Sequence, residues 1–180
     1  FKNLYFGLYY CSLNMIKYLI GCLISLALAS GYACLVGQNS NIILGMPSFY
    51  MLVIGIHLMQ FIAFVPAKNL TIEIYDLTGS ITFIVSIAFS LWIAPSVSHK
   101  QLLSALMVLV WTGRLGTFLF SRILQVGEDS RFRIIKKHGL RFFMAWCLQG
   151  LWVTITAGTV FSYLTAKASN GNNHESISLY

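Results

Sequence analysis

Five long apolar segments dominate the sequence and constrain what it can fold into. They cover residues 18–36, 49–65, 77–94, 101–121 and 142–164. A helix needs about 20 mostly apolar residues to cross the hydrocarbon of a bilayer, and each segment is close to that length. Charged residues make up only 9% of the chain, against roughly 25% in a soluble domain. The sequence therefore predicts an all-α polytopic membrane helix bundle with about five transmembrane helices.

Prolines and a polar tail set the expected boundaries. Pro47, Pro66 and Pro95 lie at the edges of segments, where proline normally ends a helix. Residues 1–164 are expected to form a single transmembrane domain. Residues 165–180 are polar and rich in Asn, Ser and Gly, a composition that predicts a disordered tail.

The beginning of the chain allows two interpretations. Because residue 1 is Phe rather than Met, we expect the sequence to start within a longer protein. A start at Met15 would instead resemble a signal peptide, with Lys17 as its charged leader and 27–29 as its small-residue cleavage site. The apolar run continues to Val36, which favours a membrane span over a cleaved signal.

The basic residues predict an orientation. Cytoplasmic loops of membrane proteins are enriched in Lys and Arg, so the side of the bundle with more of them is expected in the cytoplasm. Lys100 and Lys167 alone fall on the side away from the N-terminus. The N-terminus and the loop 122–141 are therefore expected in the cytoplasm. The N-terminal side holds Lys2, Lys17, Lys68, Arg122, Arg131, Arg133, Lys136, Lys137 and Arg141.

Two features follow from this orientation. The glycosylation sequon at 69–71 would lie in a cytoplasmic loop and stay unmodified. The stretch "DSRFRIIKKHGLR" places Phe132, Ile135 and Gly139 opposite a basic side, which predicts a short interfacial helix on the cytoplasmic leaflet. The net charge of +7 is accounted for by these flanking residues, and no aromatic interleaving points to nucleic acid.

Arg114 stands inside the fourth apolar segment. A charge near the bilayer centre costs about 2.5 to 3.5 kcal/mol on insertion scales and marks a functional position by default. It lies roughly 10 to 12 Å of helix from the cytoplasmic end of its segment. We expect it to face the bundle interior, where it either pairs with a neighbouring carbonyl, Asp76 or Glu73, or serves a cavity that opens to the cytoplasm.

Other polar residues carry weaker signals. His57 and Gln60 share one helix face, and with Gln149 they are expected to form interhelical hydrogen bonds. A charged cluster after the fourth segment could hold an anionic ligand such as phosphate, or could serve only topology and lipid headgroups. Its members are Arg122, Glu128, Asp129, Arg131 and Arg133.

Several chemistries are excluded by the absence of their motifs. The four histidines are far apart and form no HxxxH or HxxH box, so no metal site is expected. The four cysteines have no CxxC spacing and lie in or near apolar segments, so no disulfides are expected. No GxSxG, GxxxxGK[ST] or strand-linked GxGxxG motif is present.

Three stretches resemble a known family when taken together. They are "YDLTGSITF" (75–83), "WTGRLGTFLFSRILQVGEDSRF" (111–132) and "RFFMAWCLQGLWV" (141–153). In order and spacing they resemble, over residues 75–163, the steroid 5-alpha-reductase-like membrane family, through the C-terminal-related domain of its uncharacterised members. The resemblance implies a helical membrane reductase of the endoplasmic reticulum or of a bacterial membrane, which uses NADPH to reduce an enone C=C in a sterol or other lipid.

The same resemblance implies site residues for the cofactor. Arg114, Arg122, Asp129 and Arg131 would line the cytoplasmic mouth through which NADP(H) enters. The catalytic residues stay unassigned, because Glu73 and Tyr75 are the nearest acid and tyrosine by chemistry alone and match no motif of the family.

The sequence also departs from the family. Relatives continue into a further half with an Arg and a His-Pro-Asn-Tyr-like segment, whereas this chain is expected to leave the pattern near 161–164 and to be C-terminally truncated. We therefore expect a reductase that is incomplete and inactive as given. The alternative is a non-catalytic short isoform or membrane interaction protein, which exposed polar groups such as Arg114 would destabilise.

Overall fold

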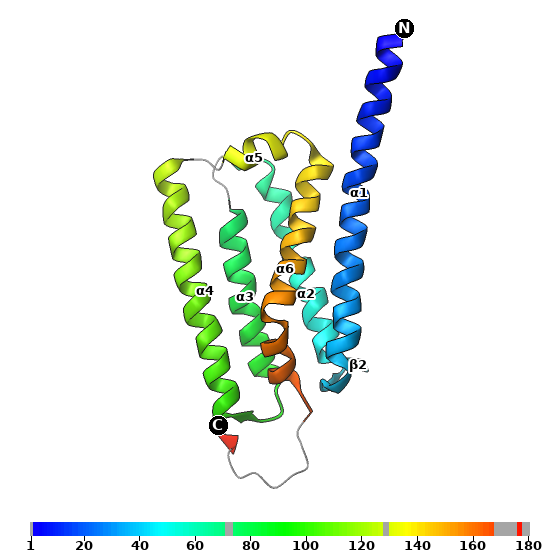
Figure 1. Ribbon diagram of the computed structural model, residues 1–180. Coiled ribbons are helices and arrows are strands. Elements are labelled where there is room, and N and C mark those ends of the chain that lie inside the picture. Colours follow the sequence, from blue (N-terminus) through cyan, green and yellow to red (C-terminus); the bar gives the residue numbers. More distant parts are fainter. Residues whose placement is uncertain (1, 71–73, 128–129, 168–175, 178–180) are drawn as a thin grey trace.

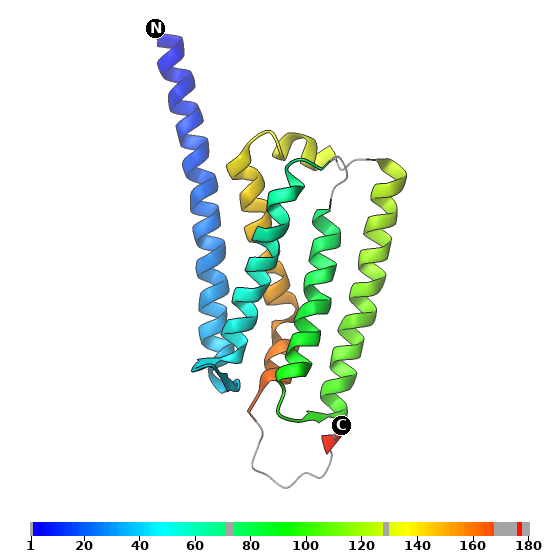
Figure 2. The same ribbon diagram turned by 180° about the vertical axis from the view of Figure 1, so that it is seen from behind.

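Figures 1 and 2 show the computed structural model. Its described residues form a bundle of five long helices with a short helix at one end. The structure describes residues 2–70, 74–127, 130–167 and 176–177, with the backbone alone at 2–14, 130–131 and 176–177. The long helices are α1 (Lys2–Val36), α2 (Ser48–Ala67), α3 (Tyr75–Ile93), α4 (His99–Val126) and α6 (Gly139–Thr165).

All five are long and apolar enough to cross a membrane, so the predicted all-α membrane bundle is confirmed. The predicted segments lie within these helices, apart from one residue at the end of the third. The first helix is longer than predicted, and its candidate span is Met15–Asn39. The five helices fit a multi-pass membrane protein.

Local sequence explains where the helices begin and end. Ser98 caps α4, accepting a hydrogen bond from the Gln101 backbone while the Gln101 side chain accepts one from the Ser98 backbone. Gly127 ends α4 at a φ of +85°, which glycine adopts without strain. Pro47 precedes α2, Pro95 follows α3, and Pro66 is the penultimate residue of α2.

Helix α6 lies at the centre of the bundle. It packs against α1, α2 and α3, whereas α4 packs mainly on α3 and touches α6 less. The apolar core between these helices includes Phe49, Ile56, Phe83, Val153 and Phe161. Helix α4 is therefore the outermost on its side of the bundle, as Figure 1 shows at the left.

Short strands close the end of the bundle opposite the N-terminus. The hairpin of β1 (Ile42–Ile43) and β2 (Met46–Pro47) turns at Leu44 and Gly45, both with positive φ. β3 (Val97–Ser98) pairs with β4 (Ser176–Ile177). The predicted disordered tail lies largely outside the described residues, and β4 is its one described strand.

The short helix α5 (Ser130–Ile135) confirms the helix predicted between the fourth and fifth spans. Its Phe132 side chain is buried, with its ring 4.9 Å from Tyr75 and 6.1 Å from Phe142. The predicted apolar side of this segment therefore packs on the bundle rather than on lipid. This end also holds the end of α2 and the beginnings of α1 and α3 (Figure 1).

Candidate functional site

A cavity of about 940 Å³ lies between α3, α4 and α6. Ligand sites in proteins commonly have volumes of about 300–1,000 Å³, so this cavity is large enough for a ligand. Each of the three helices contributes residues from one of the stretches singled out in the sequence. The lining comprises Tyr75, Asp76, Gly79, Ser80, Phe83, Trp111, Leu115, Leu119, Arg122, Leu148, Gln149, Leu151, Trp152, Ile155 and Thr156.

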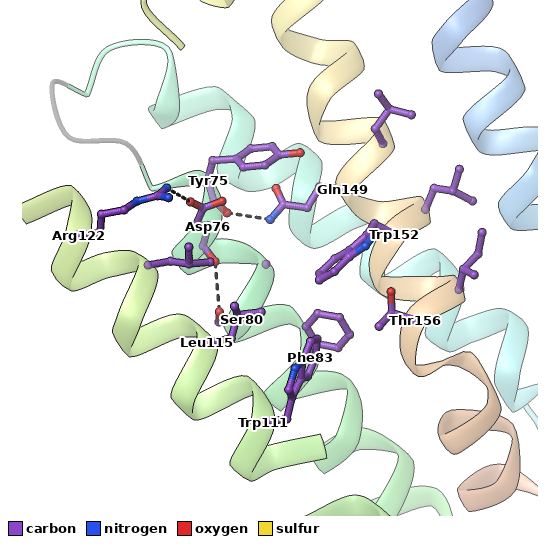
Figure 3. Close-up of a pocket in the computed structure, with 15 residues that line it drawn as sticks. Tyr75, Asp76, Ser80, Phe83, Trp111, Leu115, Arg122, Gln149, Trp152 and Thr156 are labelled. Atoms are coloured by element: carbon purple, nitrogen blue, oxygen red, sulfur yellow. Dashed lines mark hydrogen bonds and ion pairs between the residues drawn. The ribbon is translucent and has the colours of Figure 1, made fainter. Parts of the chain in front are cut away.

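Helical spacing explains why each stretch presents these residues together. On α4, Trp111, Leu115, Leu119 and Arg122 recur every three or four residues, which places them on one face of the helix. All but Ile155 and Thr156 in the lining fall within the three stretches. Segments far apart in the sequence thus converge on a single cavity (Figure 3).

The contact between α3 and α6 depends on Gly79. Gln149 lies so close to the Gly79 Cα that a Cβ there would collide with the Gln149 amide nitrogen. The same amide donates a hydrogen bond of 2.8 Å to the backbone oxygen of Tyr75. The glycine of the first stretch therefore makes room for the glutamine of the third, and the predicted interhelical hydrogen bond of Gln149 is confirmed.

The contact between α3 and α4 uses a second glycine. A Cβ on Gly116 would lie 2.7 Å from the Ser80 hydroxyl oxygen, closer than real Cβ contacts. The Ser80 hydroxyl donates a hydrogen bond of 3.2 Å to the Asp76 backbone oxygen. Small residues let membrane helices approach closely, and here they bring the polar residues of α3 against α4.

One ion pair closes the end of the cavity near α5. The Arg122 guanidinium lies 3.6 Å from the Asp76 carboxylate, with the two side chains 43% and 19% exposed. Asp76 is one of the two acids proposed to pair with Arg114, and it instead faces Arg122. Figure 3 shows this pair beside Gln149 and Ser80. The charged groups among the described lining residues are thus at one end, and Thr156 lines the cavity farther along α6.

The other end of the cavity is aromatic. The Phe83 ring lies 5.3 Å from Trp111 and 5.5 Å from Trp152, nearly perpendicular to both, and the two indoles are 6.2 Å apart. Both indoles are nearly half exposed, because they stand at the gap between α4 and α6. The cavity therefore grades from charged and hydrogen-bonding groups to an aromatic, apolar body.

The predicted cofactor residues lie at different places relative to the cavity. Arg122 lines the cavity. Arg114 is exposed on α4, one position from Leu115, and lies outside the cavity lining. The expectation that Arg114 faces the bundle interior is wrong. Its neighbour Leu115 faces the cavity, and a step of one residue turns a side chain about 100° around a helix, so Arg114 points away from it. Asp129 and Glu73 lie outside the described residues, and the Arg131 side chain is not described.

The second helix keeps its polar residues away from this cavity. Gln60 donates a hydrogen bond of 2.8 Å to the Thr82 hydroxyl, which confirms its predicted interhelical role. His57 Nδ1 instead forms a hydrogen bond with the backbone oxygen of Val53 in its own helix, so this bond is not the predicted interhelical one. The wall residues Ser80, Trp111 and Trp152 were not predicted as a group, although the spacing on α4 could have indicated that Trp111 and Arg122 share a face.

Fold and cavity together define a polytopic membrane helix bundle with an amphipathic pocket between its helices. The chain belongs to the DUF1295 family, described as a protein of unknown function, which it matches over residues 60–179. That match continues past 161–164, where the family pattern was expected to end. No curated protein and no solved structure matches the chain.

Proposed function

We propose that this chain belongs to a membrane reductase that acts on the C=C bond of an enone in a sterol or other lipid, and that the cavity holds the lipid. One observation carries the proposal: the three stretches that resemble steroid 5-alpha-reductase-like proteins line a single amphipathic cavity. Membership of the DUF1295 family supports the reductase class only through that resemblance.

The cavity walls suit such a lipid. Phe83, Trp111 and Trp152 offer flat apolar surfaces to a ring system or chain. The Arg122 guanidinium offers N–H donors at the polar end, where a carbonyl oxygen could accept a hydrogen bond. In a water-poor pocket, such donors stabilise negative charge that builds on the carbonyl oxygen during reduction. These residues would therefore orient the enone and polarise it.

The described residues of the cavity fit the nicotinamide dinucleotide less well than they fit a lipid. A dinucleotide with several phosphate groups calls for several cations or backbone donors. Among the described residues, the cavity lining contains one arginine, Arg122, and its charge already faces the Asp76 carboxylate. The remaining walls are mostly apolar. We therefore assign the lipid to this cavity and derive no step through NADPH.

The orientation of the bundle belongs to the same proposal. The polar end of the cavity lies at the end of the bundle that carries exposed Lys68, Arg133 and Lys137. By the positive-inside rule this end faces the cytoplasm. In a eukaryotic cell we place the protein in the endoplasmic reticulum, with the lipid entering from the bilayer.

Binding in nanodiscs tests the function directly. The full chain is titrated with cholestenone, an enone sterol, and separately with NADPH, and product formation is followed when both are present. Saturable cholestenone binding that weakens in Arg122→Ala supports the proposal, with exposed Arg114→Ala as the matched control. Failure of a well-folded preparation to bind any enone lipid would reject it and favour a non-catalytic membrane interaction protein.

A further inference from the structure

A second cavity continues the first along the gap between α4 and α6. It has a volume of about 340 Å³ and shares Trp111 and Thr156 with the larger cavity. From Arg122 to Ser104, the two cavities follow α4 for 18 residues, about 27 Å at 1.5 Å per residue. The second cavity is lined by Ser104, Met107, Val108, Trp111, Thr156, Ala157 and Val160.

The described lining of the extension has no charged residue, and its hydroxyl groups are those of Ser104 and of Thr156, which lies where the two cavities meet. The Ser104 hydroxyl already donates a hydrogen bond of 2.9 Å to the Lys100 backbone oxygen in its own helix. Met107, Val108 and Val160 supply apolar walls. Among the described residues that line the combined groove, the charged ones are Asp76 and Arg122, at its far end. An occupant must therefore be polar at one end and apolar over the rest of its length.

The groove is narrow and faces the bilayer. The second cavity, at about 340 Å³, is smaller than the roughly 850 Å³ that two turns of a helix about 10 Å across occupy, so a further helix does not fit inside it. Met107, Trp111 and Trp152 are exposed on its outer side, where the hydrocarbon of a membrane would lie. A flexible hydrocarbon tail from the bilayer meets both conditions.

We infer that the ligand is a tailed amphiphile, whose oxygen-bearing head lies near Asp76 and Arg122 and whose hydrocarbon tail passes Trp111 into the second cavity. The inference rests on the proposed function, because it specifies the lipid of the same cavity. It distinguishes sterols with a side chain and other long-chain enones from compact steroids without one, which would fill the larger cavity alone.

A matched pair of ligands tests this inference. The full chain in nanodiscs is titrated with cholestenone and with the same enone ring system lacking the side chain. We expect cholestenone to bind at least about tenfold more tightly, since burying roughly two methylene groups already gives that factor. Ser104→Phe, which fills the second cavity, should remove this advantage and leave the affinity for the tail-less ligand unchanged.

Controls separate a blocked groove from a damaged fold. Leu103→Phe alters an exposed neighbour on α4 that does not line the groove, and it should keep the tenfold preference. If Ser104→Phe does not fold, Val160→Phe tests the opposite wall, with exposed Thr159→Phe as its control. Equal binding of both ligands by the native chain would overturn the inference about the tail and would leave the proposal that the larger cavity binds an enone lipid intact. Binding of neither would overturn both.

Discussion

Gln149 on α6 rests against Gly79 on α3 and donates its amide hydrogen to the backbone oxygen of Tyr75, at 2.8 Å. This contact joins two stretches that are about 70 residues apart in the chain. It explains why a glycine follows Asp-Leu-Thr at the start of α3, because any side chain at that position would occupy the place of the glutamine amide. The contact also fixes one corner of the cavity.

Adding a methyl group at Gly79 should loosen this corner. We expect Gly79→Ala to lower the free energy of unfolding by about 1–3 kcal/mol, the usual cost of overpacking a closely packed site. Unfolding of the chain in mixed micelles by increasing SDS measures it. Gly113→Ala is the control, because no atom lies within 4 Å of its built Cβ. A Gly79→Ala, Gln149→Ala double variant should recover much of the loss, and no recovery would contradict this contact.

The ion pair between Asp76 and Arg122 should contribute little to stability. Its atoms are 3.6 Å apart and Arg122 is 43% exposed, so we expect a coupling of about 0.2–1 kcal/mol, typical of exposed pairs. A double-mutant cycle with Asp76→Asn and Arg122→Gln measures it, and added salt should reduce it. A coupling of several kcal/mol would show that the pair is desolvated in the membrane and not open to solvent.

The two indoles at the gap between α4 and α6 should affect ligand binding more than folding. We expect Trp111→Ala or Trp152→Ala to weaken cholestenone binding about tenfold, which corresponds to roughly 1.4 kcal/mol and to the loss of an aromatic contact. Nanodisc titrations measure this effect. Trp92→Ala serves as the control, since this side chain is 81% exposed and outside the cavity. Similar losses in all three variants would argue against an aromatic binding site.

Accessibility labelling should determine the orientation of the bundle. In a background with the four native cysteines replaced by serine, we introduce Lys137→Cys at one end and Gln38→Cys at the other, both exposed positions. In intact cells an impermeant maleimide should label Gln38→Cys if the protein is in the plasma membrane. In sealed microsomes it should label Lys137→Cys instead. Glycosylation of the sequon at 69–71 would contradict the predicted topology, because it would place this loop on the lumenal or outer side of the membrane.

The sequence by itself determined the membrane class and the helices. Apolar runs near the length of a bilayer core leave few alternatives to a helical bundle, because unpaired backbone groups are costly in lipid. Prolines marked helix ends within a few positions. The three stretches contain most of the residues that line the cavity, but Arg122 is the predicted site residue that the described lining includes.

Only the tertiary structure decided which side chains meet. Arg114 and Arg122 are both arginines on α4, yet the rotation of that helix against α3 places Arg122 beside Asp76 and leaves Arg114 exposed. Sequence spacing gives the relative angles of residues around one helix, whereas its orientation toward its neighbours comes from packing. Contacts as specific as Gln149 at Gly79 and Ser80 at Gly116 set that packing, and no pattern within one helix encodes them.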